Sequence, residues 1–146
     1  MKVFIGCDHR GVKEQEEIKD YLESLGHEVY ISGVPHNDTD DYPDFAFDVC
    51  SKVLDNNSFG ILLCGTGIGM SIAANKVKGI RAARCVNETD AYYARIHNNA
   101  NVLCLGINDT DITKLFAIAQ TFLKKYPEPE ERHKKRIEKI IKYEDG

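Results

Sequence analysis

A short apolar run followed by three alternating glycines constrains the fold of this chain more than any other segment. The run is Ile61 to Cys64, and the glycines are Gly65, Gly67 and Gly69. An Ala-rich, helix-prone segment follows, so the pattern predicts a buried parallel strand, a tight turn and the start of a helix. Glycines let backbone N–H groups approach a ligand, and a helix N-terminus adds unpaired donors and the positive end of a dipole. The segment therefore favours an anion or a developing oxyanion beside the thiol of Cys64.

Strand-like and helix-like segments alternate along the whole chain. The expected strands span residues 3–7, 27–32, 61–64, 80–86 and 102–105. The expected helices lie between 11 and 26, from about 43 to 57, at 70–77 and 88–97, from about 110 to 123, and from about 128 to 143. This alternation predicts an α/β protein, a Rossmann-like three-layer sandwich in which helices cover both faces of a five-stranded parallel sheet.

The extra C-terminal helix, at about 128–146, has no strand to return to. Ile137, Ile140 and Ile141 still give it an apolar stripe. A stripe of this kind must be covered, either by the core of its own chain or by a neighbouring subunit. The residues alone leave both alternatives open.

Length and composition limit the classes of protein to which the chain can belong. The 146 residues predict a single domain, 1–146, and the net charge of −4 gives no support to nucleic-acid binding. No apolar run approaches the length of a membrane helix, and the first residues lack the apolar core of a signal peptide. Five cysteines without a C-x-x-C pair fit a reducing compartment. We therefore expect a cytoplasmic protein without nucleic-acid or membrane partners.

The ligand crevice of such a sheet lies beyond the carboxyl ends of its strands. The residues expected there are Asp8, His9 and Arg10, then 64–69, then Asn87, and finally 106–109. His97 precedes the fifth strand and so belongs nominally to the opposite end. If His97 joins the site, the helix before it must be short or tilted, or the contact must come from another subunit.

The glycine turn has alternative interpretations. A dinucleotide fingerprint needs glycine where Met70 stands, and the lysine of a phosphate-binding P-loop is missing. A plain structural turn is also possible, but the flanking strand and helix favour an anion cradle. Cys64 is either a buried inert thiol or one that the helix N-terminus activates as a thiolate. The other cysteines are expected to be core thiols; they are Cys7, Cys50, Cys85 and Cys104.

Two further groups carry both a chemical and a plain interpretation. Asp8 and His9 suit a helix cap with a surface histidine, or an acid/base group with a phosphate donor. Arg132 and Arg136, which flank His133 within one helical turn, suit a phosphate clamp or a solvated charged face. No His, Cys and Asp spacing is convincing for a metal site.

Seven segments in chain order carry a family resemblance. They are 6–11, 41–43, 60–76, 79–82, 97–98, 101–103, and Arg132-His133 with Arg136. Together they resemble the type B ribose-5-phosphate isomerases, a family that also includes allose-6-phosphate and galactose-6-phosphate isomerase subunits. The resemblance covers nearly the whole chain, and 60–76 is its most specific part.

The resemblance implies an aldose–ketose isomerase that works through an enediolate without metal or cofactor. Interconversion of ribose 5-phosphate and ribulose 5-phosphate, a step of the pentose phosphate pathway, is the expected reaction. A six-carbon sugar phosphate is the alternative substrate, and a non-catalytic nucleotide-binding module is the alternative from another class. The family also implies a homodimer or a dimer of dimers with the active site at the subunit interface. Such an assembly would explain the contact from His97, and it favours packing of the helix at about 128–146 on a neighbouring subunit.

The resemblance also assigns catalytic roles residue by residue. Cys64 matches the base that moves a proton between C1 and C2, and Thr66 contributes its hydroxyl. His97 matches the group that helps to open the sugar ring, with Asp8 on the sugar oxygens. The backbone donors that hold the enediolate oxygens are matched by Gly65, Gly67, Ile68, Gly69 and Met70.

The remaining assignments concern substrate binding. Asn98 matches a hydroxyl-binding position, and Tyr42 of the Asp41-Tyr42-Pro43 segment is expected among the substrate contacts. The phosphate site is matched by His9, Arg132 and Arg136. Two positions depart from the family pattern. Asn99 stands where the family often has Asp, and Asn108 stands where it often has Arg. A contact to the anion is therefore either missing in this chain or replaced, for example by Arg10 or a lysine.

Overall fold

The computed structural model describes residues 1–108 and 110–146, and over these residues the chain forms one five-stranded parallel sheet. Its strands are β1 (Lys2–Cys7), β2 (Glu28–Ile31), β3 (Phe59–Cys64), β4 (Ala82–Arg84) and β5 (Val102–Gly106), in the order β2-β1-β3-β5-β4. The predicted α/β sandwich is confirmed. Asp109, at the end of the expected 106–109 segment, lies outside the described residues.

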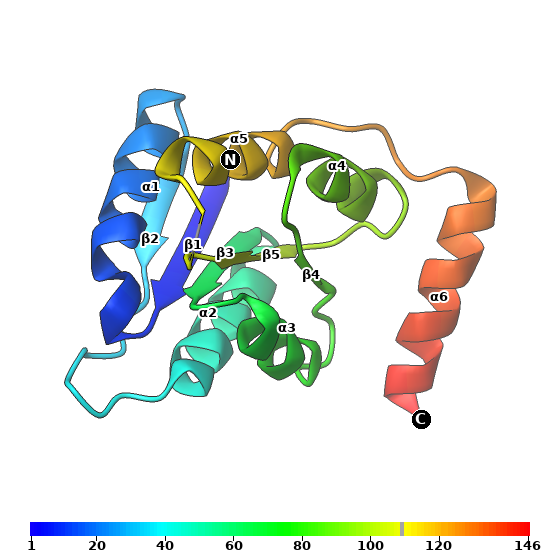
Figure 1. The fold of residues 1–146 in the computed structure, drawn as a ribbon. Helices are drawn as coiled ribbons and strands as arrows, with labels where there is room; N and C mark the ends of the chain where they lie inside the picture. Colours follow the sequence, from blue (N-terminus) through cyan, green and yellow to red (C-terminus); the bar gives the residue numbers. More distant parts are fainter. Residues whose placement is uncertain (109) are drawn as a thin grey trace.

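Helices cover both faces of the sheet (Figure 1). They are η1 (His9–Gly11, a 3-10 turn), α1 (Val12–Ser24), α2 (Tyr42–Asn56), α3 (Ile68–Asn75), α4 (Glu88–Ile96), α5 (Ile112–Phe122) and α6 (Glu131–Asp145). α1, α4 and α5 pack on one face, and α2 and α3 pack on the other (Figure 1). No helix of residues 1–108 and 110–146 is both long and apolar enough to cross a membrane.

Side-chain alternation in the central strand β3 divides the core in two. Ile61 and Leu63 point into the cluster beneath α1, α4 and α5, whereas Leu62 and Cys64 point into the cluster beneath α2 and α3. Successive residues of a strand face opposite sides of the sheet, so both faces of a central strand are buried. Cys64, the last residue of β3, therefore lies on the face from which α3 starts.

The helix boundaries follow local chemistry. Gly26 ends α1 with a φ of +94°, and Asn57 ends α2 with a φ of +47°, both in the left-handed region that glycine and asparagine tolerate best. Asn87 caps α4, because its side chain accepts a hydrogen bond from Asp90 N at 2.7 Å. Thr110, which precedes α5, donates its hydroxyl hydrogen to the carbonyl of Asn108.

The fourth strand, Ala82–Arg84, is shorter than the expected 80–86. Only Ala82–Arg84 pairs with β5, since Ile80 N donates to Val77 O in a turn and Arg81 N donates to the side chain of Asn101 at 2.8 Å. The expected third helix, 70–77, starts two residues earlier, at Ile68. In both places side-chain hydrogen bonds and turn geometry set the boundary, which cannot be predicted from the apolar pattern of the sequence.

α6 lies at the side of the molecule, away from the two helix layers (Figure 1). Asp145 of α6 forms an ion pair with Lys78 at 2.6 Å, and Ile137 of α6 is buried. Ile140 is 49% exposed and Tyr143 is 89% exposed. The apolar stripe predicted for this helix is thus only partly covered in a single chain.

Candidate active site

The glycine turn after β3 wraps around the thiol of Cys64. Gly67 N donates a hydrogen bond to Cys64 Sγ at 3.1 Å. Gly67 has a φ of +79°, a conformation that L side chains rarely adopt, so glycine is required to aim this N–H at the sulfur. Ile68 N donates to Thr66 Oγ1 at 3.2 Å, so the hydroxyl of Thr66 is anchored at the start of α3.

The next two residues of α3 offer free donors. Within the described part of the chain no hydrogen bond engages the N–H groups of Gly69 and Met70, as expected for the first turn of a helix. The ring of Tyr42 lies directly over Gly69, and a Cβ at that position would come within 2.6 Å of the ring and its hydroxyl oxygen. Gly69 therefore lies directly beneath an aromatic side chain.

A cavity of about 430 Å³ opens at this point. Its lining comes from η1, from α2 and from the ends of β3 and β5: Arg10, Tyr42, Cys64, Gly65, Thr66, Ile68, Gly69 and Asn108. Among these described residues Arg10 is the only side chain with a permanent charge. The geometry thus brings the predicted base, its glycine turn and Tyr42 into one cavity, and adds Arg10 and Asn108.

Asp8 holds Arg10 at the cavity. Arg10 donates from Nη2 and Nε to Asp8 Oδ2 at 2.7 and 3.2 Å, and Arg10 N donates to Asp8 Oδ1 at 3.1 Å. The hydrogen bond and the charge of Asp8 raise the pKa of Arg10. Asp8 is buried, so it reaches the cavity through Arg10.

The other cysteines lie in the core, and burial raises the pKa of their thiols. The pKa rises to about 12 for Cys7, Cys50 and Cys85, and well above its ordinary value for Cys104. Cys64 is 5% exposed and lines the cavity. The prediction that Cys7, Cys50, Cys85 and Cys104 are core thiols is confirmed.

His9 faces a buried carboxylate. Its Nδ1–H donates to Asp40 Oδ1 at 2.6 Å and its N–H donates to the same oxygen at 3.1 Å. Asp40 also accepts from His36 and from Asn37 N. Burial opposes ionisation of Asp40, but these hydrogen bonds, led by those of His9, outweigh it and hold its pKa well below the ordinary value.

His97 and the arginine cluster lie at another place. His97 stacks on His133 with ring centroids 4.1 Å apart, and both line a cavity of about 220 Å³ with Arg132. Burial lowers the pKa of His133, and the neighbouring His97, Arg132 and Arg136 lower it further. These predicted site residues therefore gather with one another, but not with Cys64.

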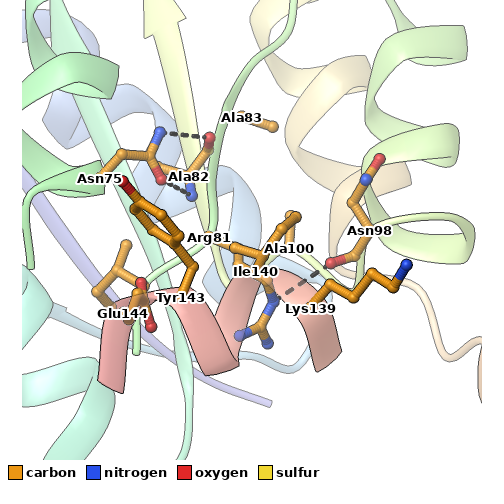
Figure 2. Close-up of a pocket in the computed structure, with 11 residues that line it drawn as sticks. Asn75, Arg81, Ala82, Ala83, Asn98, Ala100, Lys139, Ile140, Tyr143 and Glu144 are labelled. Carbon is orange, nitrogen blue, oxygen red and sulfur yellow. Dashed lines mark hydrogen bonds between the residues drawn. The ribbon is translucent and has the colours of Figure 1, made fainter. Parts of the chain in front are cut away.

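Asn98 lines a third and larger space, the groove beneath α6, of about 670 Å³ (Figure 2). Figure 2 shows α6 along one side of this groove, with Tyr143 and Lys139 turned towards it. Arg81 lies opposite and donates from Nε to the carbonyls of Asn98 and Asn99 at 3.2 and 3.0 Å. Cys64, His97 and Asn98 thus line three different cavities in a single chain.

Two residues that sequence reasoning did not single out contact the site residues. Arg84, at the end of β4, donates from Nε to the carbonyl of Thr66 at 2.8 Å. Asp40 fixes His9, as described above. Arg84 gave no sequence signal, since it sits in an ordinary strand, whereas Asp40 lies in a recognisably acidic loop. No group of three or more His, Cys, Asp or Glu residues within 1–108 and 110–146 is arranged to hold a metal.

A parallel α/β sheet with a thiol and free helix-terminal amides at its carboxyl edge defines a protein that suits small anionic ligands. The comparisons with known proteins make this specific. The model of the ribose/galactose isomerase family matches residues 3–140, and the chain belongs to this family.

Individual relatives match this chain over nearly their full lengths. A probable ribose-5-phosphate isomerase B of Mycoplasma genitalium is 46% identical over 145 residues, which is 97% of this chain and 95% of the relative. The ribose-5-phosphate isomerase B structure of Clostridium thermocellum has a TM-score of 0.92 at 43% identity, with 99% of this chain and 98% of that chain covered. The M. genitalium structure with bound ribulose-5-phosphate has a TM-score of 0.91 at 44% identity, and covers 99% of this chain and 96% of that one.

Proposed function

We propose that this protein interconverts ribose 5-phosphate and ribulose 5-phosphate, a step of the pentose phosphate pathway, with Cys64 as the base. The observation that carries the proposal is the thiol of Cys64, which lines one cavity with Thr66 and Gly69 and accepts a hydrogen bond from Gly67 N–H. The relatives named above, and the ribulose-5-phosphate bound to one of them, support the choice of substrate. The reducing cytoplasm suits its five free cysteines.

The chemistry follows from this arrangement. The Cys64 thiolate takes the proton from C2 of the open-chain aldose, and the electron pair moves into an enediolate as the C1 carbonyl oxygen gains negative charge. The amides of Gly69 and Met70 donate to that oxygen, and one such donor is worth about 3 kcal/mol in an oxyanion site. The O2 proton passes to O1 as the proton held by Cys64 returns to C1, so that C2 becomes the ketone carbonyl and C1 carries a hydroxyl. No metal is needed for these steps.

The groups that open the ring and bind the phosphate come, in this proposal, from a second copy of the chain. His97 and Arg132 line a different cavity from Cys64, so one chain alone does not bring them together. The exposed Ile140 and Tyr143 of α6 beside the 670 Å³ groove are a surface that a second copy can bury. We infer a homodimer or a dimer of dimers in which His97, Asn98, Arg132 and Arg136 of one copy complete the cavity of the other.

Ketose formation from ribose 5-phosphate, allose 6-phosphate and galactose 6-phosphate, with and without chelator, tests the reaction. We expect turnover of ribose 5-phosphate by the purified protein alone, unchanged by chelator. Preference for a six-carbon substrate would move the protein to the other branch of the family. Nucleotide binding without turnover of any of the three would refute the proposal.

Mixing two inactive variants tests the shared site. Cys64→Ala and His97→Ala are each expected to be inactive, but a hybrid dimer holds one site with both groups intact. If the copies exchange freely, the mixture is expected to regain roughly a quarter of wild-type activity. A mixture as inactive as its components, under conditions in which subunit exchange is demonstrated, would place His97 and Cys64 in the same copy.

A further inference from the structure

The peptide bond between Thr66 and Gly67 connects the thiol of Cys64 to Arg84, a cation at the surface. Its N–H end donates to Cys64 Sγ at 3.1 Å, and its C=O end accepts from Arg84 Nε at 2.8 Å. This peptide is planar and trans, so its N–H and C=O point in opposite directions. Arg84 and the thiol therefore lie at the two ends of one rigid dipole.

The peptide has little freedom to turn away from this position. A Cβ on Gly106 would lie 2.6 Å from the Thr66 oxygen, so the end of β5 passes directly beside this carbonyl. Asn108 N donates to Gly65 O at 3.0 Å and fixes the preceding residue of the turn. The hydrogen bond of Arg84 thus acts on a peptide whose plane the backbone already defines.

We propose that Arg84 is a positioning residue, which orients and polarises the Thr66–Gly67 peptide so that its N–H stabilises the thiolate of Cys64. A cationic donor on a carbonyl draws electron density towards the oxygen, and this makes the N–H of the same peptide a better donor. Arg84 acts entirely through the peptide and contacts neither the thiol nor the cavity that Cys64 lines. The role rests on the proposed function, because it matters for catalysis only if Cys64 is the base.

Other charged and titratable groups surround the same sulfur and stay unchanged when Arg84 is replaced. Arg10, with Asp8 behind it, faces the cavity from η1, and Tyr42 faces it from α2. Cys104 approaches from β5 and is kept neutral by burial, which raises its pKa. A change measured in an Arg84 variant therefore reports the peptide connection, against a constant background from these groups.

The test is alkylation of Cys64 by iodoacetamide as a function of pH, a readout that needs no turnover. The protein is the full chain, and Cys64→Ala supplies the background from the buried thiols. Arg84→Met removes the cation, Arg84→Lys keeps a cationic donor, and Lys114→Met removes an exposed charge elsewhere as a matched control. Circular dichroism at each pH checks that every variant is folded.

At pH 7 we expect alkylation of Arg84→Met to be about threefold to tenfold slower than wild type, where tenfold corresponds to one unit of thiol acidity. Near pH 10 the two proteins should converge, or the variant should be slightly faster, because a less acidic thiol is intrinsically more nucleophilic. Arg84→Lys and Lys114→Met should stay within about twofold of wild type, since each retains a cation on the Thr66 carbonyl.

Two results would overturn the inference. One is an unchanged rate at pH 7 in Arg84→Met. The other is a rate reduced by the same factor at both pH values, which would mean that Arg84 only shapes access to the thiol. Failure of the proposed function has a different signature, because full turnover by Cys64→Ala refutes the base assignment and leaves the alkylation result standing.

Discussion

Replacement of Gly106 by alanine is the sharpest single perturbation of the peptide that holds the Cys64 thiol. Gly106 ends β5, and an added Cβ would lie 2.6 Å from the oxygen and 2.7 Å from the carbonyl carbon of Thr66. Both atoms are backbone, so a rotamer change cannot relieve the contact. The Thr66–Gly67 peptide must move by several tenths of an ångström, and with it the N–H that faces Cys64.

The displacement is expected to lower both the stability of the protein and its catalytic rate. Overpacking of this kind destabilises a folded protein by about 1–3 kcal/mol. A misplacement of about 1 Å in a reacting constellation costs on the order of 100-fold in rate. Because the shift here is smaller, we expect kcat to fall roughly 10-fold to 100-fold. KM should change little, since the proposed phosphate contacts lie elsewhere.

The assay is ketose formation from ribose 5-phosphate, with urea unfolding of the same samples. Gly33→Ala is the matched control, because its Cβ would meet only the flexible end of Lys52 at 3.4 Å. The control should keep wild-type kcat and stability. A folded Gly106→Ala variant with kcat within twofold of wild type would refute the claim that this peptide sets the rate.

Three further predictions concern charged side chains. Arg136→Ala should raise KM with kcat nearly unchanged, in the same kinetic assay; a normal KM would remove Arg136 from the phosphate site. Arg95 is buried and donates to the carbonyls of Phe122 and Lys124, so Arg95→Met should lower the urea-unfolding free energy by about 2–3 kcal/mol, and an unchanged midpoint would contradict this. Asp40 has a depressed pKa, so its contribution is present above the ordinary carboxyl pKa and is lost as pH falls below it. Wild type should therefore lose more stability than Asp40→Asn between about pH 5 and pH 3, and parallel pH profiles would rule out this role.

The sequence predicted the Cys64 half of the site because its determinants are contiguous. One apolar run, three glycines and a helix start place the thiol and the amides together through local geometry alone. The layer order was also predictable, since alternating strands and helices allow few topologies. The end of α2 at Asn57 was predictable for the same local reason.

Contacts between segments that are distant in the chain could not be predicted from the sequence. The bond of Arg84 to Thr66 joins residues 18 apart, and the bonds of Asp40 to His9 join residues 31 apart. No apolar period or turn signal marks such pairs. β4 is shorter than its apolar pattern because Asn101 takes the N–H of Arg81, which is again a tertiary contact. The spacing of Arg132 and Arg136 left a phosphate clamp and a solvated face as alternatives, and only the resemblance chose between them and assigned a role to His97.

Turnover of ribose 5-phosphate by Cys64→Ala tests the central claim most directly. Loss of a positioned general base typically removes about 100-fold to 10,000-fold of rate. We predict a loss in this range, with binding of inorganic phosphate, measured by calorimetry on the same sample, unchanged. A folded Cys64→Ala variant that retains wild-type turnover would contradict the assignment of Cys64 as the base and the mechanism built on it.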